Sequence, residues 1–264
     1  MHLLDRFRLT DSVAIVTGAG QGIGRGIAIG LAQAGADVVC SARTQADLDS
    51  TVAEIEKYGR RGVAVRGDVL DPDDRERMVA AAVERFGRLD VLVNNVGGSP
   101  PVLAKDMSAE YLAEAFQINA IQSFALMKLA MPVMLKSVGR GSIVNISSRA
   151  SQMVVPHYTA YCAGKAALNH LTRVVAKEWA PRIRINAIAV GGVKTEAVKI
   201  FVADPEVEKL FADGTPLKRM GEVEDIAAAA LFLASDASSW VTGKVFEIDG
   251  GVYAPAMEMP VETL

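Results

Sequence analysis

Residues 13–35 read VAIVTGAGQGIGRGIAIGLAQAG, and this stretch decides the fold. The β-branched run at 13–17 predicts a buried strand, because short apolar runs rich in valine and isoleucine suit parallel sheets. Glycines follow at once, and then a segment of helical period ends at Gly35. Glycines allow a close backbone approach to a ligand, and a helix N-terminus offers free amides to an anion. The stretch therefore predicts a phosphate-binding turn, although glycines also form ordinary tight turns.

The alternation of strand and helix continues along the chain. Asp71 and Pro72 predict the start of a helix and Gly87 its end. Parallel strands need crossovers, and right-handed crossovers place helices on both faces of the sheet. We therefore expect an α/β fold, a single Rossmann-type doubly wound domain over residues 1–264 with a seven-stranded parallel sheet flanked by helices on both faces. The irregular stretch 191–220 is interpreted as a substrate lid. The predicted strands cover 13–17, 37–41, 62–66, 89–93, 142–146, 183–189 and 244–248.

Composition narrows the classes of partner. The 264 residues carry 28 Lys and Arg against 31 Asp and Glu, for a formal net charge of -3. This balance, without blocks of like charge, argues against nucleic acid and against an anionic membrane. We find no apolar run near the roughly 18 residues of a membrane span and no signal-peptide pattern, so we expect a cytoplasmic protein with a small-molecule partner. Cys40 and Cys162 suit neither a disulfide framework nor a metal site, and no metal is expected.

Three motifs together resemble the short-chain dehydrogenase/reductase family, from about Leu9 to about Gly251. They are Thr-Gly-x-x-x-Gly-x-Gly from Thr17, an Asn-Asn-x-Gly segment and a Tyr-x-x-x-Lys segment. The chain is similar to 3-oxoacyl-carrier-protein reductases and bacterial hydroxysteroid dehydrogenases. The resemblance implies an NAD(P)-dependent oxidoreductase (EC 1.1.1.-) and a homotetramer or homodimer. The cofactor-binding residues that it implies are Gly18, Gly22, Ile23 and Gly24 at the pyrophosphate, Asp68 and Val69 at the adenine, Asn95 at the adenosine ribose, Tyr161 and Lys165 at the second ribose, and Thr195 near the nicotinamide. Taken singly, Asp68 also fits a loop cap and Asn94 a turn.

Tyr161 and Lys165 lie one helical turn apart on one face of a predicted helix. A nearby ammonium and an oxidised nicotinamide favour phenolate, so we expect a lowered pKa that lets Tyr161 act as acid and base. The same pattern also fits a core aromatic beside a snorkelling lysine. The resemblance adds Ser148, thirteen positions before Tyr161, to orient the substrate oxygen, with Ser147 as its competitor. It also adds Asn119, whose backbone carbonyl would hold a water linked to the lysine, although this residue also fits a kink or cap of its helix.

The end of the second predicted strand reads Ser41-Ala42-Arg43. Dinucleotide folds that prefer NAD usually place an acid here for the ribose 2′-hydroxyl, whereas an arginine accepts a 2′-phosphate. Arg43 therefore favours NADP(H) over NAD(H), although it also fits a solvated strand-end residue. Gln21 argues the other way, because NADP-preferring relatives often carry arginine at that position.

The predicted reaction is hydride transfer between NADP(H) and a carbonyl or secondary alcohol. An apolar pocket is expected, and it suits a ketone, a steroid or a 3-oxoacyl thioester. Its lining is drawn from 98–101, 148–157 and the lid residues Val198, Phe201 and Phe211. His157 fits either a substrate contact or a surface position, and Val190 stands where the family usually has proline. Two alternatives remain: an NAD-dependent alcohol dehydrogenase of hydroxysteroid type using the same site, and a non-catalytic dinucleotide-binding regulator.

Overall fold

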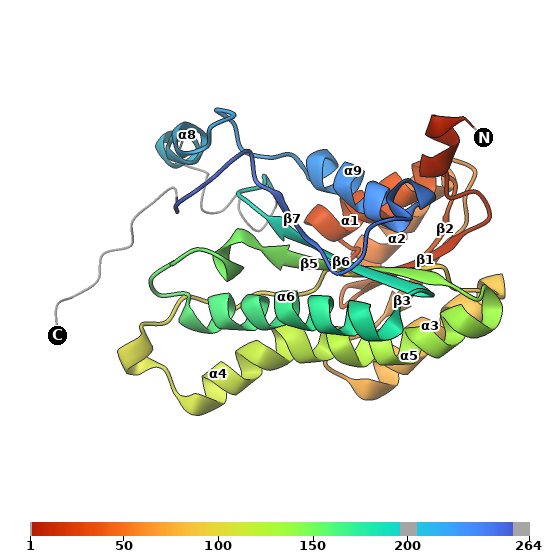
Figure 1. The fold of residues 1–264 in the computed structure, drawn as a ribbon, viewed down its shortest axis with the longest axis horizontal. Coiled ribbons are helices and arrows are strands. Elements are labelled where there is room, and N and C mark those ends of the chain that lie inside the picture. Colours follow the sequence, from red (N-terminus) through yellow and green to blue (C-terminus); the bar gives the residue numbers. More distant parts are fainter. Residues whose placement is uncertain (1, 196–204, 256–264) are drawn as a thin grey trace.

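The computed structural model describes residues 2–195 and 205–255, and its centre is a parallel sheet (Figure 1). The strand order is β3-β2-β1-β4-β5-β6-β7, and each neighbouring pair is parallel. The predicted seven-stranded sheet is confirmed, with shifts at some strand ends because ladder pairing rather than composition sets them. The strands are β1 (Val13–Thr17), β2 (Asp37–Ala42), β3 (Gly62–Arg66), β4 (Val91–Asn94), β5 (Gly141–Ser148), β6 (Ile183–Val190) and β7 (Val245–Ile248).

Helices cover both faces of the sheet, as the doubly wound topology requires. In Figure 1, α1, α2 and α9 lie on one side of the sheet, and α3, α5 and α6 lie on the other. Within β1, Ala14 and Val16 pack toward the first layer, whereas Val13 and Ile15 pack toward the second, because alternate strand residues face opposite ways. The helices are α1 (Gly22–Gln33), α2 (Gln45–Glu56), α3 (Pro72–Phe86), α4 (Ala109–Phe116), α5 (Gln122–Ser137), α6 (Thr159–Trp179), α8 (Pro205–Gly214) and α9 (Val223–Ala234).

The ends of α3 follow their sequence signals. The Asp71 side chain accepts hydrogen bonds from the amides of Asp73 and Asp74, and Pro72 occupies the first turn. Gly87 closes the helix in the left-handed conformation with φ of 79°. These local caps confirm the predicted helix.

One helical segment differs from the expectation about apolar runs. The segment Ala109–Ser137 comprises α4, a π-helical turn and α5, and it is long and apolar enough to cross a membrane, because it contains an 18-residue window with a mean hydropathy of 1.4. Polar residues scattered through it obscured this property in the sequence. Leu126, Met127 and Met134 of this segment are fully buried, in the cluster that also holds residues of the sheet. In this fold the segment is therefore a core helix.

The stretch interpreted as a lid leaves the sheet and returns to it. Val193 forms a parallel β-bridge with Gly221, so the two ends of the stretch 191–220 lie side by side. Between them, α8 carries Phe211, whereas Val198 and Phe201 lie outside the described residues. Val190, which replaces the usual proline, ends β6 in register with Ile248 of β7.

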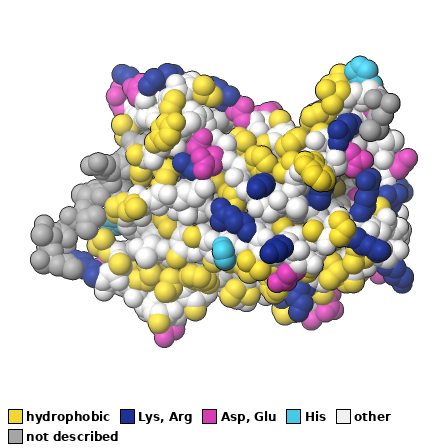
Figure 2. Space-filling view, viewed as in Figure 1, with side chains coloured by type: hydrophobic (Ala, Val, Ile, Leu, Met, Phe, Trp, Pro, Cys, Tyr) yellow, Lys and Arg dark blue, Asp and Glu magenta, His cyan; other side chains and the backbone are white. Residues whose placement is uncertain are grey.

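Charged side chains are dispersed on the face of the molecule seen in Figure 2. Basic and acidic groups alternate there with apolar ones, and neither sign dominates a large area. This distribution agrees with the near balance of charges in the sequence.

Candidate active site

The glycine loop between β1 and α1 has the geometry of a phosphate-binding turn. Gly18 and Gly22 have positive φ values of 65° and 54°, which only glycine adopts readily. A Cβ on Gly24 would overlap the carbonyl oxygen of Gly18. Within the described residues, no side chain caps α1 at Gln21, so the first-turn amides, which include that of Ile23, are available to bind an anion. The loop therefore fits the pyrophosphate of a dinucleotide.

A cleft of about 840 Å³ opens beside this loop. Gly18, Asp68, Val69 and Asn95 line it, together with Arg43 at the end of β2. These residues come from the ends of four neighbouring strands, where open α/β sheets bind ligands. The cleft therefore suits the adenosine half of a dinucleotide.

Two of these residues also shape the backbone. The amide nitrogen Nδ2 of Asn95 donates to the Thr17 carbonyl at 3.0 Å, and Thr17 Oγ1 accepts from the Asn95 amide at 3.0 Å. The Asp68 carboxylate accepts from the Leu70 amide at 2.9 Å. Val69 is buried and lines the same cleft. The loop-forming interpretation of Asp68 thus holds alongside its place at the cleft.

Tyr161 and Lys165 lie on one face of α6. Lys165 Nζ lies 6.0 Å from the centroid of the Tyr161 ring and donates to the Ile146 carbonyl at 2.8 Å. Ser148, at the end of β5, is hydrogen-bonded to the Tyr161 hydroxyl. The competitor Ser147 is buried, and its hydroxyl points to the Lys165 carbonyl at 3.5 Å. The geometry therefore favours Ser148 as the partner of Tyr161.

Burial controls the protonation of both α6 groups. It raises the pKa of the Tyr161 phenol, and the hydrogen bond with Ser148 opposes that rise only in part. It lowers the pKa of the Lys165 ammonium to about 8. In the protein alone, burial therefore decides the direction of the pKa shift at Tyr161, because the Lys165 ammonium is directed at the Ile146 carbonyl. The phenol is therefore held as a proton donor at neutral pH. The lowering expected beside an oxidised nicotinamide stays a prediction.

Asn119 lies behind the lysine, in a break of the long helical segment. The π-helical turn Gln117–Ile121 places a hydrogen bond from the Gln122 amide to the Gln117 carbonyl. Such insertions displace backbone carbonyls from the regular pattern and often occur at functional sites. The Asn119 side chain accepts from the Gly98 amide at 2.8 Å and donates to the Ala115 carbonyl at 2.9 Å. Both interpretations of Asn119, helix break and site residue, therefore have support.

Two glycines that the sequence reasoning missed permit this packing. A Cβ on Gly97 would lie 2.5 Å from Lys165 Nζ and 2.9 Å from Asn119 Oδ1. A Cβ on Gly164 would lie 3.0 Å from the Asn119 Cβ. The available signal was a glycine within each of the two motifs, Asn-Asn-x-Gly and Tyr-x-x-x-Lys.

The segments expected at the substrate side meet near Tyr161. The Val102 amide donates to the His157 carbonyl at 2.8 Å, and His157 has a positive φ of 69°. The rings of Tyr158 and Tyr161 meet edge to face at 6.3 Å. Thr195 lies beside the glycine loop, with its Cβ 3.5 Å from the position of a Cβ on Gly22.

An ion-pair network beside Ser148 also escaped the sequence reasoning. Arg149 Nε lies 2.7 Å from Asp249 Oδ2, and Arg149 Nη1 lies 2.8 Å from Glu247 Oε1. Arg149 also donates to the Val252 carbonyl at 2.9 Å. These contacts join the turn after β5 to β7 and to the segment that follows it. No local pattern could reveal partners about 100 residues away.

Metal and disulfide chemistry find no support in the described ranges. Within residues 2–195 and 205–255, no three His, Cys, Asp or Glu side chains are grouped to hold a metal ion. Cys40 and Cys162 are both free thiols.

Comparison with known proteins agrees with this geometry. A family model described as Enoyl-(Acyl carrier protein) reductase matches residues 18–253. The 7α-hydroxysteroid dehydrogenase of Escherichia coli is 39% identical over 248 residues, covering 94% of this chain and 96% of that protein.

Two solved structures are also similar. A 7α-hydroxysteroid dehydrogenase complexed with NADH and 7-oxo glycochenodeoxycholic acid has a TM-score of 0.90 and 39% identity, covering 96% of this chain and 98% of that one. A protein described as a putative 2-deoxy-D-gluconate 3-dehydrogenase from Agrobacterium tumefaciens, with bound NADP, has a TM-score of 0.84 and 34% identity, covering 93% and 97%. The extent of these matches, together with the glycine loop and the Tyr161 constellation, shows that the chain belongs to the short-chain dehydrogenase/reductase family of NAD(P)-dependent oxidoreductases.

Proposed function

We propose that the chain transfers a hydride between NADP(H) and a carbonyl or secondary alcohol, with Tyr161 as general acid and base. One observation carries this proposal: four polar groups converge where β4 and β5 end. The Tyr161 hydroxyl is hydrogen-bonded to Ser148, Lys165 is buried one turn further along α6, and Asn119 packs behind the Gly97 backbone. A phenol paired with a hydroxyl and backed by a lysine can move one proton to or from a substrate oxygen.

Each of the four residues takes a distinct part. In reduction, the Tyr161 hydroxyl donates its proton to the carbonyl oxygen, and Ser148 orients that oxygen as charge develops. Lys165 holds the ribose hydroxyls and returns a proton to Tyr161 through water at the Asn119 carbonyl. In oxidation these proton movements reverse. When bound, the nicotinamide supplies or accepts the hydride, so the protein contributes positioning and electrostatics.

The dinucleotide would lie along the ends of β1 to β4 and reach Tyr161 on α6. The glycine loop would bind its pyrophosphate through backbone amides, and the cleft beside it would take the adenosine. The residues that would hold it are Gly18, Gly22, Ile23 and Gly24 at the pyrophosphate, Asp68, Val69 and Asn95 at the adenosine, Tyr161, Lys165 and Thr195 at the nicotinamide half, and Arg43 at the 2′-phosphate.

The preference for NADP(H) is supported by the charge at the end of β2. Arg43 is exposed and lines the cleft, and the two residues before it, Ser41 and Ala42, carry no acid. A carboxylate is nevertheless near, because Asp47 lines the same cleft and accepts from Gln21 Nε2 at 2.9 Å. The two similar structures named above hold NADH and NADP respectively, so both cofactors occur on this fold. The arginine favours NADP(H) because it can pair with a phosphate dianion.

For the substrate we propose an apolar ketone, a steroid or a 3-oxoacyl thioester. The likeness to a hydroxysteroid dehydrogenase and to a 3-oxoacyl-[acyl-carrier-protein] reductase of Synechocystis supports the last two. The stretch 191–220 would act as a lid over this pocket, within a single domain of residues 1–264. We further propose a cytoplasmic homotetramer or homodimer. An NAD-dependent alcohol dehydrogenase that uses the same site is the alternative.

A substrate panel with a tyrosine control tests the reaction. Ketones and alcohols would be followed by nicotinamide absorbance with NADPH and NADH, for the wild type, Tyr161→Phe and Tyr158→Phe. Loss of the general acid should lower kcat of Tyr161→Phe by about 100- to 10,000-fold. Tyr158→Phe removes the same hydroxyl from the neighbouring ring and should keep most activity. Full activity of Tyr161→Phe would refute the mechanism, and cofactor binding without turnover across the panel would favour a regulator.

A further inference from the structure

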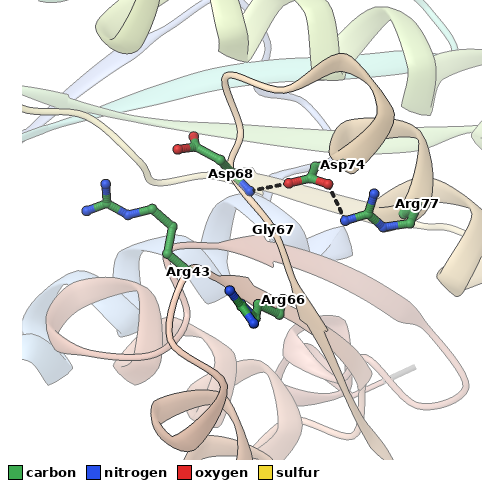
Figure 3. Close-up of a pocket in the computed structure, with 6 residues that line it drawn as sticks. All are labelled: Arg43, Arg66, Gly67, Asp68, Asp74 and Arg77. Carbon is green, nitrogen blue, oxygen red and sulfur yellow. Dashed lines mark hydrogen bonds and ion pairs between the residues drawn. The ribbon is translucent and has the colours of Figure 1, made fainter.

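Two arginines lie at the carboxyl ends of adjacent strands of the sheet. Arg43 follows β2, and Arg66 is the last residue of β3, where it is the register partner of Ala42. The Gly67 amide donates to the Ala42 carbonyl at 3.0 Å, so pairing continues past Arg66 and fixes the two strand ends together. Figure 3 shows both side chains at the same edge of the sheet.

A cavity of about 480 Å³ lies between these strand ends and the start of α3. It is distinct from the larger cleft but adjoins it, because Arg43, Gly67 and Asp68 line both. The cavity therefore opens toward the position proposed for the adenosine. Its full lining is Arg43, Arg66, Gly67, Asp68, Asp74 and Arg77.

The ion pairs around this cavity leave two cations without partners. Arg77 pairs with Asp74, which also accepts from the Asp68 amide at 2.6 Å (Figure 3). The side chains of Arg43 and Arg66 make no hydrogen bond or ion pair with any residue in the described part of the chain. Two like charges beside one cavity repel each other, and an anion placed between them would relieve that repulsion.

We propose that Arg66 is a second ligand of the 2′-phosphate of NADP(H) and determines cofactor specificity together with Arg43. This inference rests on the proposed function, because the proposed function places the 2′-phosphate beside Arg43. A phosphate dianion offers acceptor oxygens to two guanidinium forks, and each charge-assisted contact strengthens binding. NAD(H) carries only a hydroxyl at this carbon and gains nothing from Arg66. Arg66 would therefore discriminate between NADP(H) and NAD(H) without contacting the reacting atoms.

Binding measurements without substrate test this assignment. NADPH and NADH would be titrated by nucleotide fluorescence, with adenosine 2′,5′-bisphosphate and 5′-AMP as competitors. Arg66→Ala should weaken binding of NADPH and of the bisphosphate by about tenfold or more, and should change binding of NADH and 5′-AMP by less than about twofold. Arg66→Lys keeps the charge and should recover part of the loss.

The control is Arg85→Ala, which removes the same charge from the exposed last turn of α3, outside the cavity. It should leave all four affinities unchanged, and unfolding temperatures would show that each variant folds. If Arg43→Ala weakens NADPH binding and Arg66→Ala does not, the assignment of Arg66 is wrong while the proposed function stands. If the wild type binds NADH as tightly as NADPH, the NADP(H) preference fails and this inference with it. Neither result would contradict the proposal that hydride transfer depends on Tyr161.

Discussion

Replacement of Lys165 by methionine should change how stability depends on pH. Burial lowers the pKa of this lysine from 10.5 to about 8. Between these values the unfolded chain holds the proton and the folded chain does not, so the stability of the wild type rises with pH across that window. The interval from 8 to 10.5 corresponds to about 3 kcal/mol of unfolding free energy.

The variant Lys165→Met removes this contribution and leaves the Ile146 carbonyl without its donor, at a cost of about 1 kcal/mol at every pH. We therefore expect the variant to be more stable than the wild type by about 2 kcal/mol at pH 7. Near pH 10.5 and above, it should be less stable by about 1 kcal/mol. The two stability curves should cross between these pH values.

Urea unfolding followed by circular dichroism at pH 7, 9 and 10.5 measures this difference. Comparing variant with wild type cancels the titration of other groups. Lys177→Met serves as the matched control, because Lys177 is exposed on the same helix. Its stability relative to the wild type should not vary with pH. A constant difference between Lys165→Met and the wild type from pH 7 to 10.5 would refute the reasoning.

Three other outcomes are expected. Gly97→Ala would put a methyl group 2.5 Å from Lys165 Nζ and displace the ammonium. The kcat should therefore fall by about 100-fold while the circular dichroism spectrum stays native. Unchanged turnover would contradict this packing of Gly97 against Lys165. Because burial raises the pKa of Tyr161, alcohol oxidation should accelerate as pH rises from 7 to 10, and a flat pH profile of kcat would count against a phenol base. Arg149→Met would leave Asp249 buried without its partner and should destabilise the fold by about 3 kcal/mol in thermal unfolding. Adding Asp249→Asn should recover part of that loss, and no recovery would argue against the ion pair.

Local sequence patterns were sufficient to predict much of the fold. The turn after β1 could be predicted because Gly18 and Gly22 need positive φ, a property of single residues. The strands could be predicted because β-branched runs bounded by turn residues are short-range signals. Tyr161 and Lys165 could be paired because helical spacing places them on one face.

Other features depended on contacts between distant segments. In the protein alone, the direction of the pKa shift at Tyr161 depends on burial and on the Lys165 ammonium being directed at the Ile146 carbonyl on β5, and the lowering expected beside an oxidised nicotinamide stays a prediction. The contact of Arg149 with Asp249 joins positions 100 residues apart. That Leu126, Met127 and Met134 of the apolar segment Ala109–Ser137 lie in the core depended on the sheet residues that pack against them.

The sequence by itself determined the elements, the phosphate-binding turn and the Tyr-x-x-x-Lys spacing, because these follow from backbone preferences and periodicity within a few residues. Only the tertiary structure decided the strand order and whether Ser147 or Ser148 meets Tyr161. It also decided that Arg43 and Arg66 line one cavity. The physical reason is that parallel pairing and side-chain burial arise between residues far apart in the chain, which no local pattern encodes.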